Sequence, residues 1–185
     1  MSQTSPLSSP DHMMNESSAM KKVMGLVPHA MAIFMTAIFV DSLRFKFSNA
    51  IETQTIFGAL DGWAGGFGLA GIFAQTGLLS QYVIGSIELL AAILLVVGIL
   101  PKFRHLQAGG ALAGLLVMMG AVSFHLFTPL GIDPNHDGGG LFVAACINLG
   151  FGALLLGVFR RNELGILVSR ITAIFAPLHP DMRTA

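Results

Sequence analysis

Charge is the property that this 185-residue sequence has least of. Only 11% of its residues are Asp, Glu, Lys or Arg, against about 25% in an average soluble domain. Ten basic and ten acidic residues leave a net charge of zero. This balance argues against a nucleic-acid partner, because affinity for phosphates comes mainly from clustered Lys and Arg.

Cysteine is almost absent as well, with Cys146 as the single example. One cysteine excludes an intrachain disulfide and a Cys-x-x-Cys redox pair. Cys146 falls in an apolar stretch, and we interpret it as a small buried hydrophobe. The polar, Ser-rich start also lacks the apolar stretch of a signal peptide, so residues 1–20 are expected to form a disordered cytoplasmic tail.

Apolar residues dominate what remains, at 54% of the chain. A membrane-spanning helix needs about 20 mostly apolar residues. Four stretches qualify, at 23–40, 82–100, 108–127 and 141–159. We therefore predict an all-α fold, a four-transmembrane-helix bundle over residues 21–161.

The basic residues predict the orientation of these spans. Only Arg44 and Lys46 lie on one side of the predicted membrane, while eight lie on the other: Lys21, Lys22, Lys102, Arg104, Arg160, Arg161, Arg170 and Arg183. Lys and Arg are retained in the cytoplasm. Both termini are therefore expected inside, with the loop between the last two spans outside.

Two further apolar segments are poor candidates for spans. Thr55–Gly77 is Gly-rich, and we expect it to lie in the outer interface or to form a short re-entrant helix, with a flexible loop as the alternative. Within it, Gly58, Gly62, Gly66 and Ala70 recur every four residues, which is typical of a close-packing helix face. Residues 162–185 are expected to form an amphipathic helix on the cytoplasmic surface, followed by a tail.

Ionisable residues inside the predicted spans need an explanation, because each costs about 2.5–3.5 kcal/mol at a helix centre. His29, Glu88 and His125 are in this position. By their distance from the span ends, Glu88 and His125 share the outer half, whereas His29 lies in the inner half. A bis-histidine haem is rejected because its ligands would lie at different depths. No cofactor is predicted, and a quinone is kept as an alternative.

The outer half also receives the residues that follow the first span. We predict an outer polar cluster that consists of Asp41, Arg44, Lys46, Glu52, Glu88 and His125. Asp41 and Arg44 are three residues apart and can pair on one helix face. The cluster is either an ion-paired network that stabilises the bundle or a proton-linked or ligand-binding pocket.

One loop has the start of a calcium-binding pattern. Asp133, Asn135 and Asp137 match the spacing D-x-N-x-D-G. The position of the closing Glu is occupied by Ala144. We therefore favour a turn that uses Asp, Asn and Gly for their conformational tolerance, with a metal site there as the lesser alternative and no other metal site expected.

The order of these features resembles a known family. Arg44-Phe-Lys46-Phe-Ser, Ile84-Gly-Ser-Ile-Glu88-Leu-Leu, Gly120-Ala-Val-Ser-Phe-His125-Leu and Asp137-Gly-Gly-Gly-Leu141-Phe together resemble DoxX-like membrane proteins. The Lys-Phe-Ser stretch with Glu52 and Ile56 is also similar to the YkgB-type family. The long N-terminal tail and the Gly-rich segment depart from that family pattern.

The resemblance implies a small four-helix protein of the bacterial inner membrane. Some relatives are associated with redox complexes, including a thiosulfate:quinone oxidoreductase subunit. The expected function is an accessory or anchor subunit of a membrane redox or stress-response complex, which binds other membrane or peripheral subunits. The alternatives are a quinone-reactive oxidoreductase subunit and a small oligomeric transporter. The residues that match by position are Lys46, Glu88 and His125, and no catalytic residue can be assigned.

Overall fold

The computed structural model describes residues 10–175, and this part of the chain contains helices and no strands. The elements, in order, are α1 (Pro10–Phe47), α2 (Ile51–Gly65), α3 (Gln81–Val97), the short 3-10 helix η1 (Pro101–Phe103), α4 (Arg104–Phe127), α5 (Gly140–Leu154), the π-helical turn η2 (Leu155–Phe159) and α6 (Arg161–Phe175).

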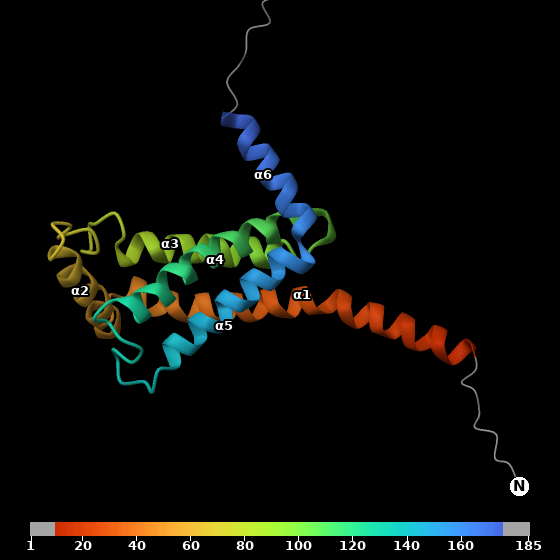
Figure 1. The fold of residues 1–185 in the computed structure, drawn as a ribbon, viewed down its shortest axis with the longest axis horizontal. Helices are drawn as coiled ribbons and strands as arrows, with labels where there is room; N and C mark the ends of the chain where they lie inside the picture. The colour runs from red at the N-terminus through yellow and green to blue at the C-terminus, as the bar shows by residue number, and fades with distance from the viewer. Residues whose placement is uncertain (1–9, 176–185) are drawn as a thin grey trace, which may run out of the picture.

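Four of these helices lie lengthwise beside one another (Figure 1). Helix α3 packs against α1 and α4, while α5 packs against α4 and α1. Helix α2 lies across one end of this bundle, and α6 leaves from the opposite end (Figure 1). We call these the α2 end and the α6 end. The α2 end holds the end of α1 and the start of α3, and the α6 end holds η1 and the start of α4 (Figure 1).

All four predicted spans are helical, and three are long and apolar enough to cross a membrane. The ranges Met20–Phe47, Pro101–Phe127 and Gly140–Phe159 have mean hydropathies of 2.0, 1.8 and 2.3. Helix α3 is apolar but shorter, with 17 residues, or about 26 Å at the rise of an α-helix.

The first helix is longer at both ends than its sequence indicates. It begins at Pro10, so residues 10–20, expected to be disordered, form its first turns. The remainder of the expected tail, residues 1–9, lies outside the described residues. At its other end α1 continues to Phe47, beyond the end of the predicted span at Val40, so Asp41, Arg44 and Lys46 lie on its last turns, as their predicted pairing on one helix face requires.

Small residues hold α4 close to its neighbours. A Cβ atom added at Gly110 would lie 2.8 Å from the backbone oxygen of Ala91 and 2.8 Å from the backbone nitrogen of Leu95, both on α3. At Gly114 it would lie 2.9 Å from the ring of Phe39 on α1. The Gly110-x-x-x-Gly114 pattern, typical of helix pairs in membranes, is therefore used inside this chain, between α4 and its own neighbours.

The Gly-rich segment forms a cap on the α2 end. Its helix ends at Gly65, so Gly66 and Ala70 do not extend the expected small-residue face. Leu60 and Ala64 pack with Phe73 and Leu130 in a second apolar cluster. The loop after α2 is fixed by Asp61, whose Oδ1 accepts hydrogen bonds from the backbone nitrogens of Gly71 at 2.9 Å and Phe73 at 3.0 Å.

The expected amphipathic helix at the C-terminal end is present as α6. It packs against α4 and η2 near its start, where Leu164 contacts the main core. Ile166 and Val168 are half exposed. The helix then points away from the bundle (Figure 1). The predicted tail after residue 175 lies outside the described residues.

Candidate functional site

The most buried ion pair among the described residues joins α1 to α3. The Nζ atom of Lys46 lies 3.0 Å from Oε2 and 3.2 Å from Oε1 of Glu88. Only 14% of the Lys46 side chain and 3% of the Glu88 side chain are exposed. Lys46 also donates a hydrogen bond to Ser42 Oγ, one turn earlier on α1. The carboxylate therefore has its counter-charge in direct contact, as the sequence predicted for a Glu inside a span.

The neighbouring residues of α3 position this pair. A Cβ atom at Gly85 would lie 3.4 Å from Lys46 Cδ, so the glycine leaves the space in which the lysine stem lies. The side chain of Gln81 donates from Nε2 to the backbone oxygen of Lys46 and to Asn49 Oδ1, both at 2.9 Å. Asn49 adopts a φ of 52°, a left-handed conformation that Asn tolerates better than most residues.

The carboxyl group of Glu88 is paired with Lys46 but not fully saturated by hydrogen bonds. Lys46 meets Oε1 with hydrogen-bond geometry, while Oε2, although 3.0 Å from Nζ, receives no well-directed donor among the described residues. Such an oxygen can accept one further hydrogen bond. The pair stabilises the contact between α1 and α3.

The other predicted members of the polar cluster do not join this pair. Asp41 and Arg44 bind each other at 2.7 Å, with side chains that are 61% and 66% exposed. Glu52 is exposed on the first turn of α2. The predicted pairing of Asp41 with Arg44 and of Glu88 with a cation is therefore present, but the expectation of one convergent cluster is wrong.

His125 has partners of its own at the end of α4. Its Nδ1 lies 2.6 Å from the backbone oxygen of Gly131, and its ring meets the ring of Phe142 edge-on with centroids 5.5 Å apart. The side chain is 5% exposed. It joins the end of α4 to the loop before α5, and no hydrogen bond or ion pair among the described residues connects it to Glu88.

The loop with the calcium-like pattern uses its carboxylates to hold its own backbone. Asp133 Oδ1 accepts from Asp137 N at 2.8 Å, and the two oxygens of Asp137 accept from Gly139 N at 2.9 Å and Leu141 N at 3.0 Å. Burial raises the pKa of Asp137. The hydrogen bonds from the backbone of Leu141, Gly139 and Gly140 and from the side chain of Asp133 have the larger opposite effect, so the pKa lies below its usual value. The turn interpretation therefore accounts for Asp133 and Asp137, while no hydrogen bond of the Asn135 side chain occurs among the described residues. Within residues 10–175 no three acidic, His or Cys side chains form a metal-binding group.

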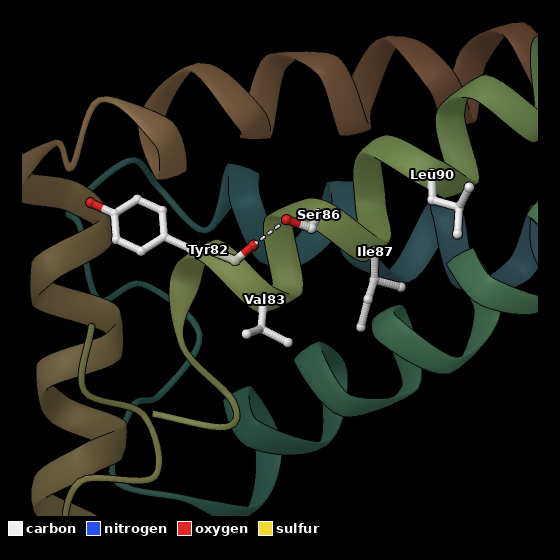
Figure 2. A pocket seen from close by; sticks show the side chains of 5 residues that line it. All are labelled: Tyr82, Val83, Ser86, Ile87 and Leu90. Atoms are coloured by element: carbon white, nitrogen blue, oxygen red, sulfur yellow. Dashed lines mark hydrogen bonds between the residues drawn. The ribbon is translucent and has the colours of Figure 1, made fainter. Parts of the chain in front are cut away.

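A shallow apolar groove lies on the outer face of α3. It has a volume of about 420 Å³ and is lined by Tyr82, Val83, Ser86, Ile87 and Leu90. Figure 2 shows Val83, Ile87 and Leu90 pointing to the same side, whereas the Tyr82 ring points away from them. The Ser86 hydroxyl already donates to the backbone oxygen of Tyr82 at 2.7 Å (Figure 2). The groove thus offers apolar contact and few free polar groups.

Several buried polar residues were not anticipated from the sequence, among them Gln107, Asn148 and Arg160. Gln107 and Asn148 are both 0% exposed, and Arg160 is 6% exposed. Arg160 Nε donates to Gln107 Oε1 at 2.8 Å, near the α6 end. Neither side-chain polar atom of Asn148 has a hydrogen-bond partner among the described residues. Asn148 is the lone amide in its apolar stretch, which is the signal that could have identified it.

The fold and these sites define a helical protein with apolar helices that could cross a membrane. Comparisons with protein-family models, with curated proteins and with solved structures find no match to this chain. The resemblance to DoxX-like proteins therefore stays a prediction.

Proposed function

We propose that the chain is an integral protein of the bacterial inner membrane with four spans, formed by α1, α3, α4 and α5. The support comes from the surface of the bundle. Large apolar side chains that are 37% or more exposed occur on each of these helices, including Phe34, Leu90, Leu116 and Val143. Hydrocarbon is the environment that suits large exposed apolar side chains on all four helices.

The proposed orientation has the α6 end in the cytoplasm. A reporter enzyme that is active only in the periplasm is expected to be inactive when fused after Ala185 and active when inserted near Asn135, in the loop between α4 and α5. The same pair of fusions with a reporter that is active only in the cytoplasm should give the reciprocal pattern. Activity of the periplasmic reporter after Ala185 would contradict the orientation.

We further propose that the protein is an accessory or anchor subunit of a membrane redox or stress-response complex. The observation that carries this proposal is the exposed apolar surface of the α2 end, at the cap formed by α2 and the loop after it. Ile51 and Phe67 are each 69% exposed and Leu78 is 76% exposed. The adjacent helix α2 carries two glycines, Gly58 and Gly62, against which no other part of the described chain packs. An apolar surface next to such a helix favours contact with another subunit.

The test for this function uses two glycines on the exposed face of α2. Nothing lies within 4 Å of a Cβ added at Gly58 or Gly62, so leucine at both positions fits the chain itself. We expect the Gly58→Leu/Gly62→Leu variant to fold normally and to lose its partners when the tagged chain is purified from native membranes. Mass spectrometry of the purified sample measures which subunits and cofactors are retained.

Gly150→Leu provides the matched control. Gly150 is an exposed glycine on α5 with nothing within 4 Å of an added Cβ, and it lies outside the α2 cap. This control should keep the same partners as the unaltered protein. If the α2 variant retains them too, or if the unaltered chain is purified without any other subunit, the accessory role is wrong.

The groove on α3 favours a second function, a quinone-reactive subunit. Its apolar lining and open shape suit an isoprenoid tail, and Glu88 belongs to the same helix. Glu88, however, is buried against Lys46 on α1, while Val83, Ile87 and Leu90 are exposed. A quinol-oxidation assay on the purified chain separates the two functions, because an accessory subunit alone gives no turnover.

A further inference from the structure

Arg160 is a buried cation that has no carboxylate partner within the described part of the chain. Its side chain donates from Nε to Gln107 Oε1 at 2.8 Å and from Nη1 to the backbone oxygen of Phe159 at 3.3 Å. Among the described residues, the two ion pairs use Arg44 and Lys46. Arginine is almost never buried unless it is paired, since an uncompensated buried charge is costly. A guanidinium has five N–H donors, and these two bonds use only part of them.

The π-helical turn is what directs Arg160 inward. The buried residues of α5 recur at helical spacing, at Ala145, Asn148, Gly152 and Leu155 with Leu156. In a continuous α-helix the next residue on that face would be Phe159. The wider turn closes with a hydrogen bond from Arg160 N to Leu155 O at 2.7 Å. The inserted residue brings Arg160 to the inner face, and π-turns of this kind are frequent at functional sites.

The surroundings of Arg160 supply donors and positive charge. Gln107 Nε2 is a buried nitrogen without a hydrogen-bond partner among the described residues. The positive charge of Arg104 also acts on Arg160. The backbone of Gln107 approaches Gly98 closely, since a Cβ atom added at Gly98 would lie 2.3 Å from the Gln107 nitrogen.

The nearest acidic residue does not neutralise this charge. The pKa of Arg160 lies below its usual value, and burial is the largest cause. The negative charge of Glu163 raises this pKa, and the positive charge of Arg104 lowers it. Glu163 therefore acts on Arg160, but it forms no ion pair with it among the described residues. Among the residues that the structure describes, the α6 end of the bundle thus combines a buried arginine without an ion-pair partner, a second arginine and the unsatisfied Nε2 of Gln107.

We propose that Arg160, together with Gln107, binds a phosphate oxyanion at the α6 end of the bundle. The planar fork of a guanidinium matches the geometry of phosphate oxygens. Arg160 directly follows the apolar range that ends at Phe159, which is the depth at which lipid headgroups lie, and basic pockets between spanning helices bind such headgroups. The phosphate belongs to an anionic phospholipid or is free inorganic phosphate.

The test compares two adjacent arginines on the full chain in a maltoside detergent. Arg160→Gln and Arg161→Gln remove the same charge, but Arg161 is exposed. Native mass spectrometry with added phosphatidylglycerol measures bound lipid. We expect one tightly held lipid on the unaltered chain, about tenfold weaker binding in Arg160→Gln, and a change within about twofold in Arg161→Gln.

A second arm identifies the source of the phosphate. Inorganic phosphate added without lipid should raise the melting temperature of the unaltered chain only if the free anion is the ligand, and Arg160→Gln should abolish that rise. Selective binding of phosphatidylglycerol with no response to inorganic phosphate assigns the site to a lipid. If neither probe binds the unaltered chain, or if both variants weaken binding equally, the proposal is wrong.

A third variant covers the case in which Arg160→Gln does not fold. Arg160→Lys keeps the charge but loses the forked pair of donors. We expect at least threefold weaker binding of the same probe by Arg160→Lys. Unchanged binding in that folded variant would overturn the role given to the guanidinium. This site does not depend on the proposed accessory function, because its readout needs no partner subunit.

Discussion

Glu88→Gln is expected to lower the free energy of unfolding by about 3–5 kcal/mol, the cost of leaving one member of a buried ion pair without its partner. The substitution keeps the shape of the side chain and removes its charge. Lys46 would then hold an ammonium group in a site where only 14% of its side chain is exposed. Reversible unfolding in mixed micelles with increasing denaturing detergent measures the change.

The exposed pair of the same helix provides the control. Asp41→Asn breaks the contact with Arg44, but both side chains are more than half exposed, so the expected loss is below about 1 kcal/mol. A Lys46→Met/Glu88→Leu double variant removes both charges and should recover much of the stability that Glu88→Gln loses.

The same series distinguishes a stabilising pair from a functional one. If Glu88→Gln retains its stability and loses partner binding or a response to pH, the pair is a functional site. If stability, partner binding and pH response are all unchanged, the pair at Lys46 and Glu88 has neither role.

Gly110→Ala is expected to cost about 2–3 kcal/mol of stability, because its new methyl group has no space. The added Cβ would lie 2.8 Å from two backbone atoms of α3, at Ala91 and Leu95. Backbone atoms cannot rotate away as a side chain can, so α3 and α4 must separate. The same unfolding assay measures this loss.

The adjacent glycine is a matched control for that variant. At Gly109 an added Cβ would meet only Leu94 Cδ1, at 3.8 Å, which is an ordinary contact. Alanine has a higher helix propensity than glycine, so Gly109→Ala should be neutral or stabilising by up to about 1 kcal/mol. Equal losses in the two variants would show that α3 and α4 do not approach as closely as the structure has them.

The sequence by itself determined the helices that form the bundle. Apolar stretches of about 20 residues have few other stable structures, because the backbone must satisfy its own hydrogen bonds in an apolar environment. The stretches at 82–100, 108–127 and 141–159 therefore coincide closely with α3, α4 and α5 followed by η2. The sequence determined the ends of the helices less well. The first span was predicted to end at residue 40, whereas α1 continues to Phe47.

The sequence also indicated that Glu88 needs a cation, since a buried carboxylate must be compensated. It could not choose among Lys46, Arg44 and His125, because depth along the helix does not specify direction around it. In the tertiary structure, the rotation of each helix about its own axis determines which of these side chains meets Glu88. Lys46 faces α3 and binds Glu88, whereas His125 faces the loop before α5.

Only the tertiary structure showed that Arg160 is buried. In the sequence, Arg160 and Arg161 together mark the cytoplasmic end of a span, and nothing there distinguishes one from the other. One additional residue in the π-turn rotates Arg160 toward Gln107 and leaves Arg161 exposed. Composition and spacing determine which segments are helical and apolar, while the rotation of each helix decides which polar side chains meet, and that rotation follows from close packing at residues such as Gly85 and Gly110.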